Sequence, residues 1–172
     1  KTLANIDGDL SLAQVHDLIQ PRGHSPVIQR RRAALIVSRA RIVAGVFSIL
    51  TPLWIAIDMY LFAWPEWGYL AALRIAASIA FGALALYYRG GEGMKQAWAA
   101  LAWLLSVPTL FFIALHPMVN QFDPDSPAAA IAAGYAFLPF VMCAGLSVFP
   151  ITALEGIVFA TPLLLAHLTA GV

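Results

Sequence analysis

Apolar residues gather into five long runs along the chain, separated by short polar connections. The runs cover about 33–62, 68–88, 97–115, 127–149 and 151–169. A helix needs about 20 apolar residues to cross a hydrocarbon core of ~30 Å, and each run is close to that length. The pattern therefore predicts an all-α, polytopic transmembrane bundle with about five spans. We expect a sixth span to follow Val172.

The N-terminal segment, residues 1–32, is the distinctly polar part of the chain. Between Leu10 and Ile19, apolar residues recur with a period near 3.6, which predicts a short amphipathic helix on the membrane surface or against the bundle. Arg30, Arg31 and Arg32 follow it. The sequence thus divides into a cytoplasmic N-terminal segment, 1–32, and a transmembrane bundle, 33–172.

Composition supports the membrane assignment. Hydrophobic residues make up 61% of the chain and charged residues 11%, whereas soluble domains average about 45–50% and about 25%. The net charge of +1 gives no reason to expect a nucleic-acid partner, and the lipid bilayer is the partner that the composition favours. The single cysteine, Cys143, excludes intramolecular disulfides and Cys-based zinc sites.

Lys and Arg are distributed unevenly between the connections. They concentrate before and early in the first run, where Arg39 and Arg41 are expected to reach the headgroups, and recur at Arg89 and Lys95. The connections 63–67 and 116–126 contain none. Because positive residues favour the cytoplasmic side, the N-terminus is predicted to be cytoplasmic.

Two charged residues fall well inside the first two runs. Asp58 and Arg74 flank the same short connection, so antiparallel helices would place them at similar depth. Since an isolated charge in hydrocarbon is costly, we expect them to form an ion pair. Such a pair is either a structural clasp of the hairpin or an anionic-ligand site in which Arg74 is the binding group.

Three further polar residues are assigned to the outer half of the bundle: His116, Tyr135 and His167. With Asp58 and Arg74 they form the predicted ligand-binding set. The two histidines are alternatively axial ligands of a b-type haem, or ligands of another metal. Glu155 lies near the inner surface, as a hydrogen-bonded carboxylate or as a signal-relaying group.

Prolines interrupt four of the five runs, at Pro52, Pro108, Pro139 and Pro162. Each favours a kink, and kinked helices enclose cavities more readily than straight ones. The sequence contains no P-loop, GxSxG or HExxH motif. We therefore assign no catalytic residue.

The chain resembles a known family in several short segments. They are the basic segment before the first span, Gln29–Arg32 with Arg39 and Arg41, and the stretches Trp64–Gly68 and Phe137–Phe140. The chain resembles the membrane-associated sensor (MASE-like) domains that precede bacterial diguanylate cyclases, histidine kinases and class III adenylyl cyclases. The resemblance implies a non-catalytic input module in the bacterial inner membrane. It further implies homodimerisation through a cytoplasmic output domain, which would be the enzyme.

The expected function is therefore a sensory input domain that binds a small or lipophilic ligand and regulates a cytoplasmic signalling domain. One alternative is a redox module that holds haem b or a metal at His116 and His167. Another is a small transporter subunit, for which more polar groups at the midplane or discontinuous helices would be expected.

Overall fold

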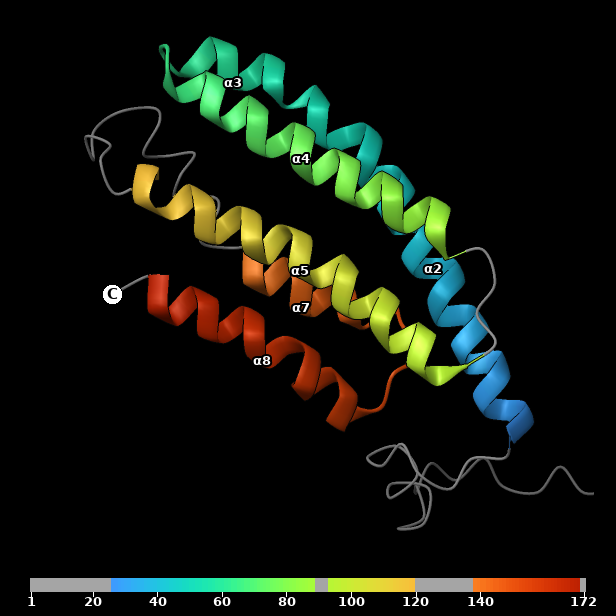
Figure 1. The fold of residues 1–172 in the computed structure, drawn as a ribbon. Coiled ribbons are helices and arrows are strands. Elements are labelled where there is room, and N and C mark those ends of the chain that lie inside the picture. Colours follow the sequence, from blue (N-terminus) through green and yellow to red (C-terminus); the bar gives the residue numbers. More distant parts are fainter. Residues whose placement is uncertain (1–25, 89–92, 120–137, 171–172) are drawn as a thin grey trace, which may run out of the picture.

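The computed structural model describes residues 26–88, 93–119 and 138–170. Every element in these ranges is an α-helix, which confirms the all-α class. In chain order they are α2 (Pro26–Leu53), α3 (Ile55–Leu61), α4 (Glu66–Tyr87), α5 (Met94–Val119), α7 (Leu138–Leu146) and α8 (Ala153–Ala170). Figure 1 shows them as one elongated bundle, with α3 continuing α2 across a short break.

Within the described residues, three helical stretches are long and apolar enough to cross a membrane. They are Pro26–Leu61, which joins α2 and α3, then α4, and then Met94–Met118 of α5. Of the fourth predicted span, 127–149, residues 127–137 lie outside the described residues, and α7 forms 9 residues of the remainder. The fifth corresponds to α8, whose strongly apolar part is the shorter stretch Ala153–Ala166. The structure therefore supports three of the five predicted spans.

The first helix begins earlier than its apolar run. The described part of α2 starts at Pro26, seven residues before the apolar run that we placed from Ala33. Arg30, Arg31 and Arg32 are therefore helical, although we placed them before a first span that begins at Ala33. The amphipathic helix expected between Leu10 and Ile19 lies outside the described residues.

The break between α2 and α3 follows from one proline. Pro52 has no amide hydrogen, so it cannot donate to the carbonyl of Ser48 four residues earlier. The hydroxyl of Ser78, on α4, donates to that same carbonyl. A side chain of the neighbouring helix thus satisfies the backbone acceptor that the proline left free, as hydrocarbon surroundings require.

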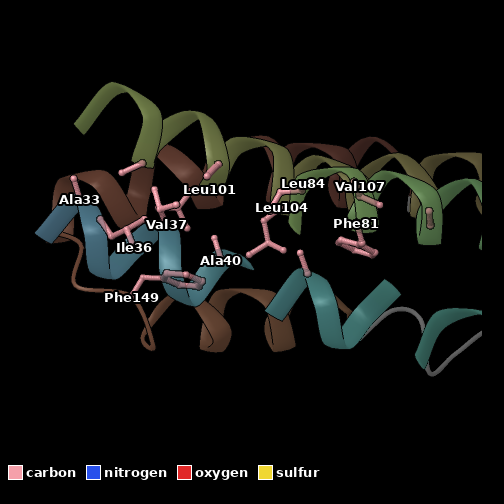
Figure 2. Packing of buried hydrophobic residues seen from close by; sticks show 14 residues of the cluster. Ala33, Ile36, Val37, Ala40, Phe81, Leu84, Leu101, Leu104, Val107 and Phe149 are labelled. Carbon is pink, nitrogen blue, oxygen red and sulfur yellow. The ribbon is translucent and has the colours of Figure 1, made fainter. Parts of the chain in front are cut away.

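The core lies between α2, α4 and α5, which contact one another pairwise. Small residues of α2, namely Ala33, Ala40 and Ala44, are fully buried there. Phe81, Leu84 and Leu101 of the other two helices fill the space beside them (Figure 2). Small side chains let helix backbones approach closely, which is how membrane helices gain packing energy.

Large apolar side chains point outward over most of the bundle. Ile49 is 69% exposed, Ile79 67% and Leu110 64%, on α2, α4 and α5 respectively. A water-soluble monomer rarely exposes so continuous an apolar surface. This surface is compatible with a lipid environment.

The last two described helices pair with each other, as the short turn between them predicted. α7 and α8 contact and run antiparallel, and α8 also packs against α5 (Figure 1). The connection between α7 and α8, residues 147–152, lies at the same end of the bundle as the starts of α2 and α5 (Figure 1). We call this the arginine end, made of residues 26–41, 85–88, 93–98 and 147–155.

Candidate functional site

Asp58 and Arg74 form the predicted ion pair. The guanidinium of Arg74 donates from Nε to Oδ2 of Asp58 and from its second terminal nitrogen to Oδ1, the latter at 2.9 Å. Asp58 is 2% exposed and Arg74 5%. The pair joins α3 to α4 across the short connection, so it clasps the hairpin where the helices turn. Two-point bonding fixes both the distance and the orientation of the groups.

Aromatic rings cover the guanidinium of Arg74. Its carbon lies 5.8 Å from the ring centroid of Trp54 and 5.5 Å from that of Phe111. A cation over an aromatic face is stabilised, more strongly when it is shielded from water. Phe111 belongs to α5, so the Arg74 cluster, defined as Asp58, Arg74, Trp54 and Phe111, brings three helical stretches together. An anionic ligand at Arg74 would compete with Asp58 for the guanidinium.

The other predicted ligand-binding residues are placed only in part. His116 lies near the end of α5, with its ring centroid 6.1 Å from that of Phe112. The hydroxyl of Tyr69 donates to the carbonyl of Ala114 at 2.9 Å, which puts this part of α5 beside the start of α4. His116 is therefore at the same end of the bundle as Asp58 and Arg74. Tyr135 and the side chain of His167 lie outside the described residues.

The haem alternative stays a prediction, because it needs both His116 and His167. Among the described residues, no group of three or more His, Cys, Asp or Glu side chains is arranged to hold a metal ion.

A second buried ion pair was not predicted. Arg32 of α2 donates to Oε2 of Glu155 on α8, and Nε of Arg32 donates to the carbonyl of Pro150. Nε1 of Trp98, on α5, donates to Oε1 of Glu155 at 3.0 Å. Arg32 is 9% exposed and Glu155 6%. The Glu155 cluster, defined as Arg32, Trp98, Thr152 and Glu155, thus ties three helices together at the arginine end.

Thr152 and Glu155 also form the N-terminal cap of α8. The amide of Thr152 donates to Oε2 of Glu155 at 2.8 Å, and the amide of Glu155 donates to Oγ1 of Thr152 at 3.4 Å. This reciprocal pattern is a capping box, and its Thr-x-x-Glu spacing is readable in the sequence. This spacing would have predicted that Glu155 lies in the first turn of a helix. It could not have predicted the ion pair with Arg32, which is 123 positions away in the sequence.

Two other arginines of α2 bond to backbone carbonyls, where we had expected them to reach the headgroups. Arg39 donates to the carbonyl of Val148 in the α7–α8 connection. Arg41 donates from Nε to the carbonyl of Ala85 at 3.0 Å, near the end of α4. The last carbonyls of a helix and those of a connection lack helical partners. Satisfying them within the protein removes a large cost in a membrane.

Together these observations define, over the part of the chain that the structure describes, an all-helical fold with three apolar helices long enough to span a membrane and two buried ion pairs between helices. Comparison with protein families, curated proteins and solved structures yields no match. The function is therefore inferred from the chain's own residues.

Proposed function

We propose that the chain is a sensory input module of the bacterial inner membrane, with a cytoplasmic N-terminus, that regulates a cytoplasmic signalling domain. The ligand is a small lipophilic acid whose carboxylate exchanges with Asp58 at Arg74. His116, and Tyr135 and His167 of the sequence-based set, complete the proposed ligand-binding region. The Glu155 cluster relays the resulting movement.

The observation that carries the proposal is that both buried ion pairs join separate helices. Asp58–Arg74 links α3 to α4, and Arg32–Glu155 links α2 to α8. A contact of this kind has two discrete arrangements, made and broken, because a partly separated buried pair is unfavourable. A ligand that binds one arrangement better shifts the population toward it.

Arg74 has the chemistry that such an exchange requires. Its guanidinium binds a carboxylate at two points, and the rings of Trp54 and Phe111 provide apolar surroundings for an alkyl chain. Replacing Asp58 by a free carboxylate keeps the positive charge of Arg74 paired. It releases Asp58, and with it α3, from α4.

The path between the two clusters runs through α5. Phe111 of α5 contacts Arg74, and Trp98 of the same helix donates to Glu155. A shift of α5 relative to α4 therefore changes the contacts of both clusters. This makes α5 the element through which a ligand at Arg74 acts on the arginine end.

The test uses octanoate as the probe and two pairs of spin labels, in protein reconstituted in lipid with Cys143→Ser. One pair replaces the exposed residues Met59 and Ile75, on α3 and α4. The other replaces the exposed residues Ser38 and Leu154, on α2 and α8. Octanoate should change both distance distributions, and octanol, which has no carboxylate, should change neither.

Arg74→Met should abolish the octanoate response, and Asp58→Asn should lower the octanoate concentration that produces it. The ligand proposal is wrong if octanoate and octanol act alike. The relay is wrong if octanoate moves the α3–α4 pair alone. A Soret absorption band in the purified protein that is lost in His116→Ala would favour the haem module instead.

A further inference from the structure

The described part of the arginine end carries more positive charge than its own carboxylates neutralise. Arg32 is paired with Glu155, and Arg39 and Arg41 donate to backbone carbonyls. Arg30 and Arg31, in the first turns of α2, are exposed, and so is Lys95 in the first turn of α5. Within the described part of this end, Glu155 is the one carboxylate, and Arg32 already neutralises it.

The first turns of α2 and α5, which carry these three exposed cations, lie next to each other in the fold. Arg31 precedes Arg32, and Lys95 is one helical turn before Trp98. Arg32 and Trp98 both donate to Glu155, so the first turns of α2 and α5 converge on one point. Ala33 and Ala97 are fully buried in the shared core, which fixes the two helices against each other there.

Exposed apolar side chains occur in the same part of α2 and α5 as the cations. Val27 is 70% exposed, Ile28 53% and Trp98 38%, all in the same turns as the cations. A surface that mixes exposed aliphatic residues, a tryptophan and cations matches the boundary between acyl chains and headgroups. It is a poor match for a purely aqueous partner, because the aliphatic residues would remain in water.

We propose that the arginine end binds anionic phospholipid through Arg30, Arg31 and Lys95. The phosphate and glycerol headgroup contacts the three cations, and the acyl chains pack along the exposed side chains of Leu35 and Ile42, which follow the cations on α2. Each cation near a negatively charged membrane surface strengthens binding about fivefold, and the effect is screened by salt. This surface is independent of the ligand exchange at Arg74.

The test measures lipid binding to the full chain in detergent by native mass spectrometry. Phosphatidylglycerol and phosphatidylcholine of equal chain length are compared at low and high ammonium acetate. Phosphatidylglycerol should bind more tightly, and its advantage should shrink as salt rises. The variant Arg30→Gln/Arg31→Gln/Lys95→Gln should lose most of that advantage, by about fivefold for each charge removed.

Gln96→Ala and Ser38→Ala are the matched controls, because both residues are exposed near the same turns and neither is charged. Both should bind phosphatidylglycerol as the parent chain does. Equal binding of the two lipids, or an unchanged triple variant with native helix content, overturns the proposal. If soluble glycerol phosphate competes at the same concentration as the lipid, the surface is a phosphate site and the lipid assignment is wrong.

Discussion

Separating Asp58 from Arg74 should destabilise the bundle by an amount that depends on which partner remains. In Asp58→Asn, the amide oxygen still accepts one bond from Arg74, whose guanidinium keeps the rings of Trp54 and Phe111. In Arg74→Met, the carboxylate of Asp58 loses both bonds and the charge that balances it. Breaking a buried pair costs roughly 3–5 kcal/mol. We therefore expect about 3 kcal/mol for Asp58→Asn and about 5 kcal/mol for Arg74→Met.

The double variant Asp58→Asn/Arg74→Met contains neither charge, so nothing is stranded in the hairpin. Its loss should be smaller than the sum of the two single losses by about 2–3 kcal/mol, the coupling expected of residues in one network. The side chains are 3% and 6% exposed, so water cannot substitute for the missing partner.

The measurement is reversible unfolding in bicelles, by detergent titration monitored by circular dichroism. Met59→Leu and Ile75→Leu serve as controls, because these residues are exposed one position away from each partner and should change stability by less than about 0.5 kcal/mol. Strictly additive losses would show that the two charges do not stabilise each other, and the clasp would be refuted.

Three further predictions use the same unfolding assay or simple labelling. Glu155→Gln should lower the free energy of unfolding by about 3 kcal/mol, because Arg32 loses its counter-charge. Trp98→Phe removes one hydrogen bond to a carboxylate and should lower it by about 1.5 kcal/mol. Equal losses would contradict this order. Ser78→Ala should lower the free energy of unfolding by about 1 kcal/mol in the parent chain. The loss should be much smaller in the Pro52→Ala background, because the restored amide can donate to the carbonyl of Ser48. The same loss in both backgrounds would refute our account of the break between α2 and α3. The orientation is tested by cysteine labelling of intact cells in a Cys143→Ser background. Asp123→Cys should react with a membrane-impermeant thiol reagent, and Ile28→Cys should not. The reverse pattern would overturn the proposed orientation.

The apolar runs predicted the helices well, since hydrophobicity and length are local properties. The predicted second run, 68–88, differs from α4 by only a few residues. Asp58–Arg74 was also predictable, because a short connection between antiparallel helices sets the depth of both residues. Its aromatic partner on α5, Phe111, was not, because that contact depends on how a third helix packs.

The helix that contains the first predicted span begins before that span, which we placed from Ala33. We set Arg30, Arg31 and Arg32 apart from the apolar run and assigned none of them a partner within the bundle. Arg32 is buried because Glu155 and the carbonyl of Pro150 receive its hydrogen bonds. Which carboxylate would do so depends on the packing of α8 against α2, and no local pattern encodes that.

The spacing of the arginines along α2 nevertheless determines which neighbouring carbonyls each of them can reach. Arg32 and Arg39 are seven residues apart, which returns a helix to within about 20° of the same face. Both donate to carbonyls of one connection, Pro150 and Val148. Arg41 is two residues further on, about 200° around the helix, and it donates to Ala85 of α4 instead. One helix thus satisfies the carbonyls of two different neighbours from two faces. In a membrane, where such carbonyls have no water to bond, this spacing fixes which face of α2 meets α4 and which meets the α7–α8 connection.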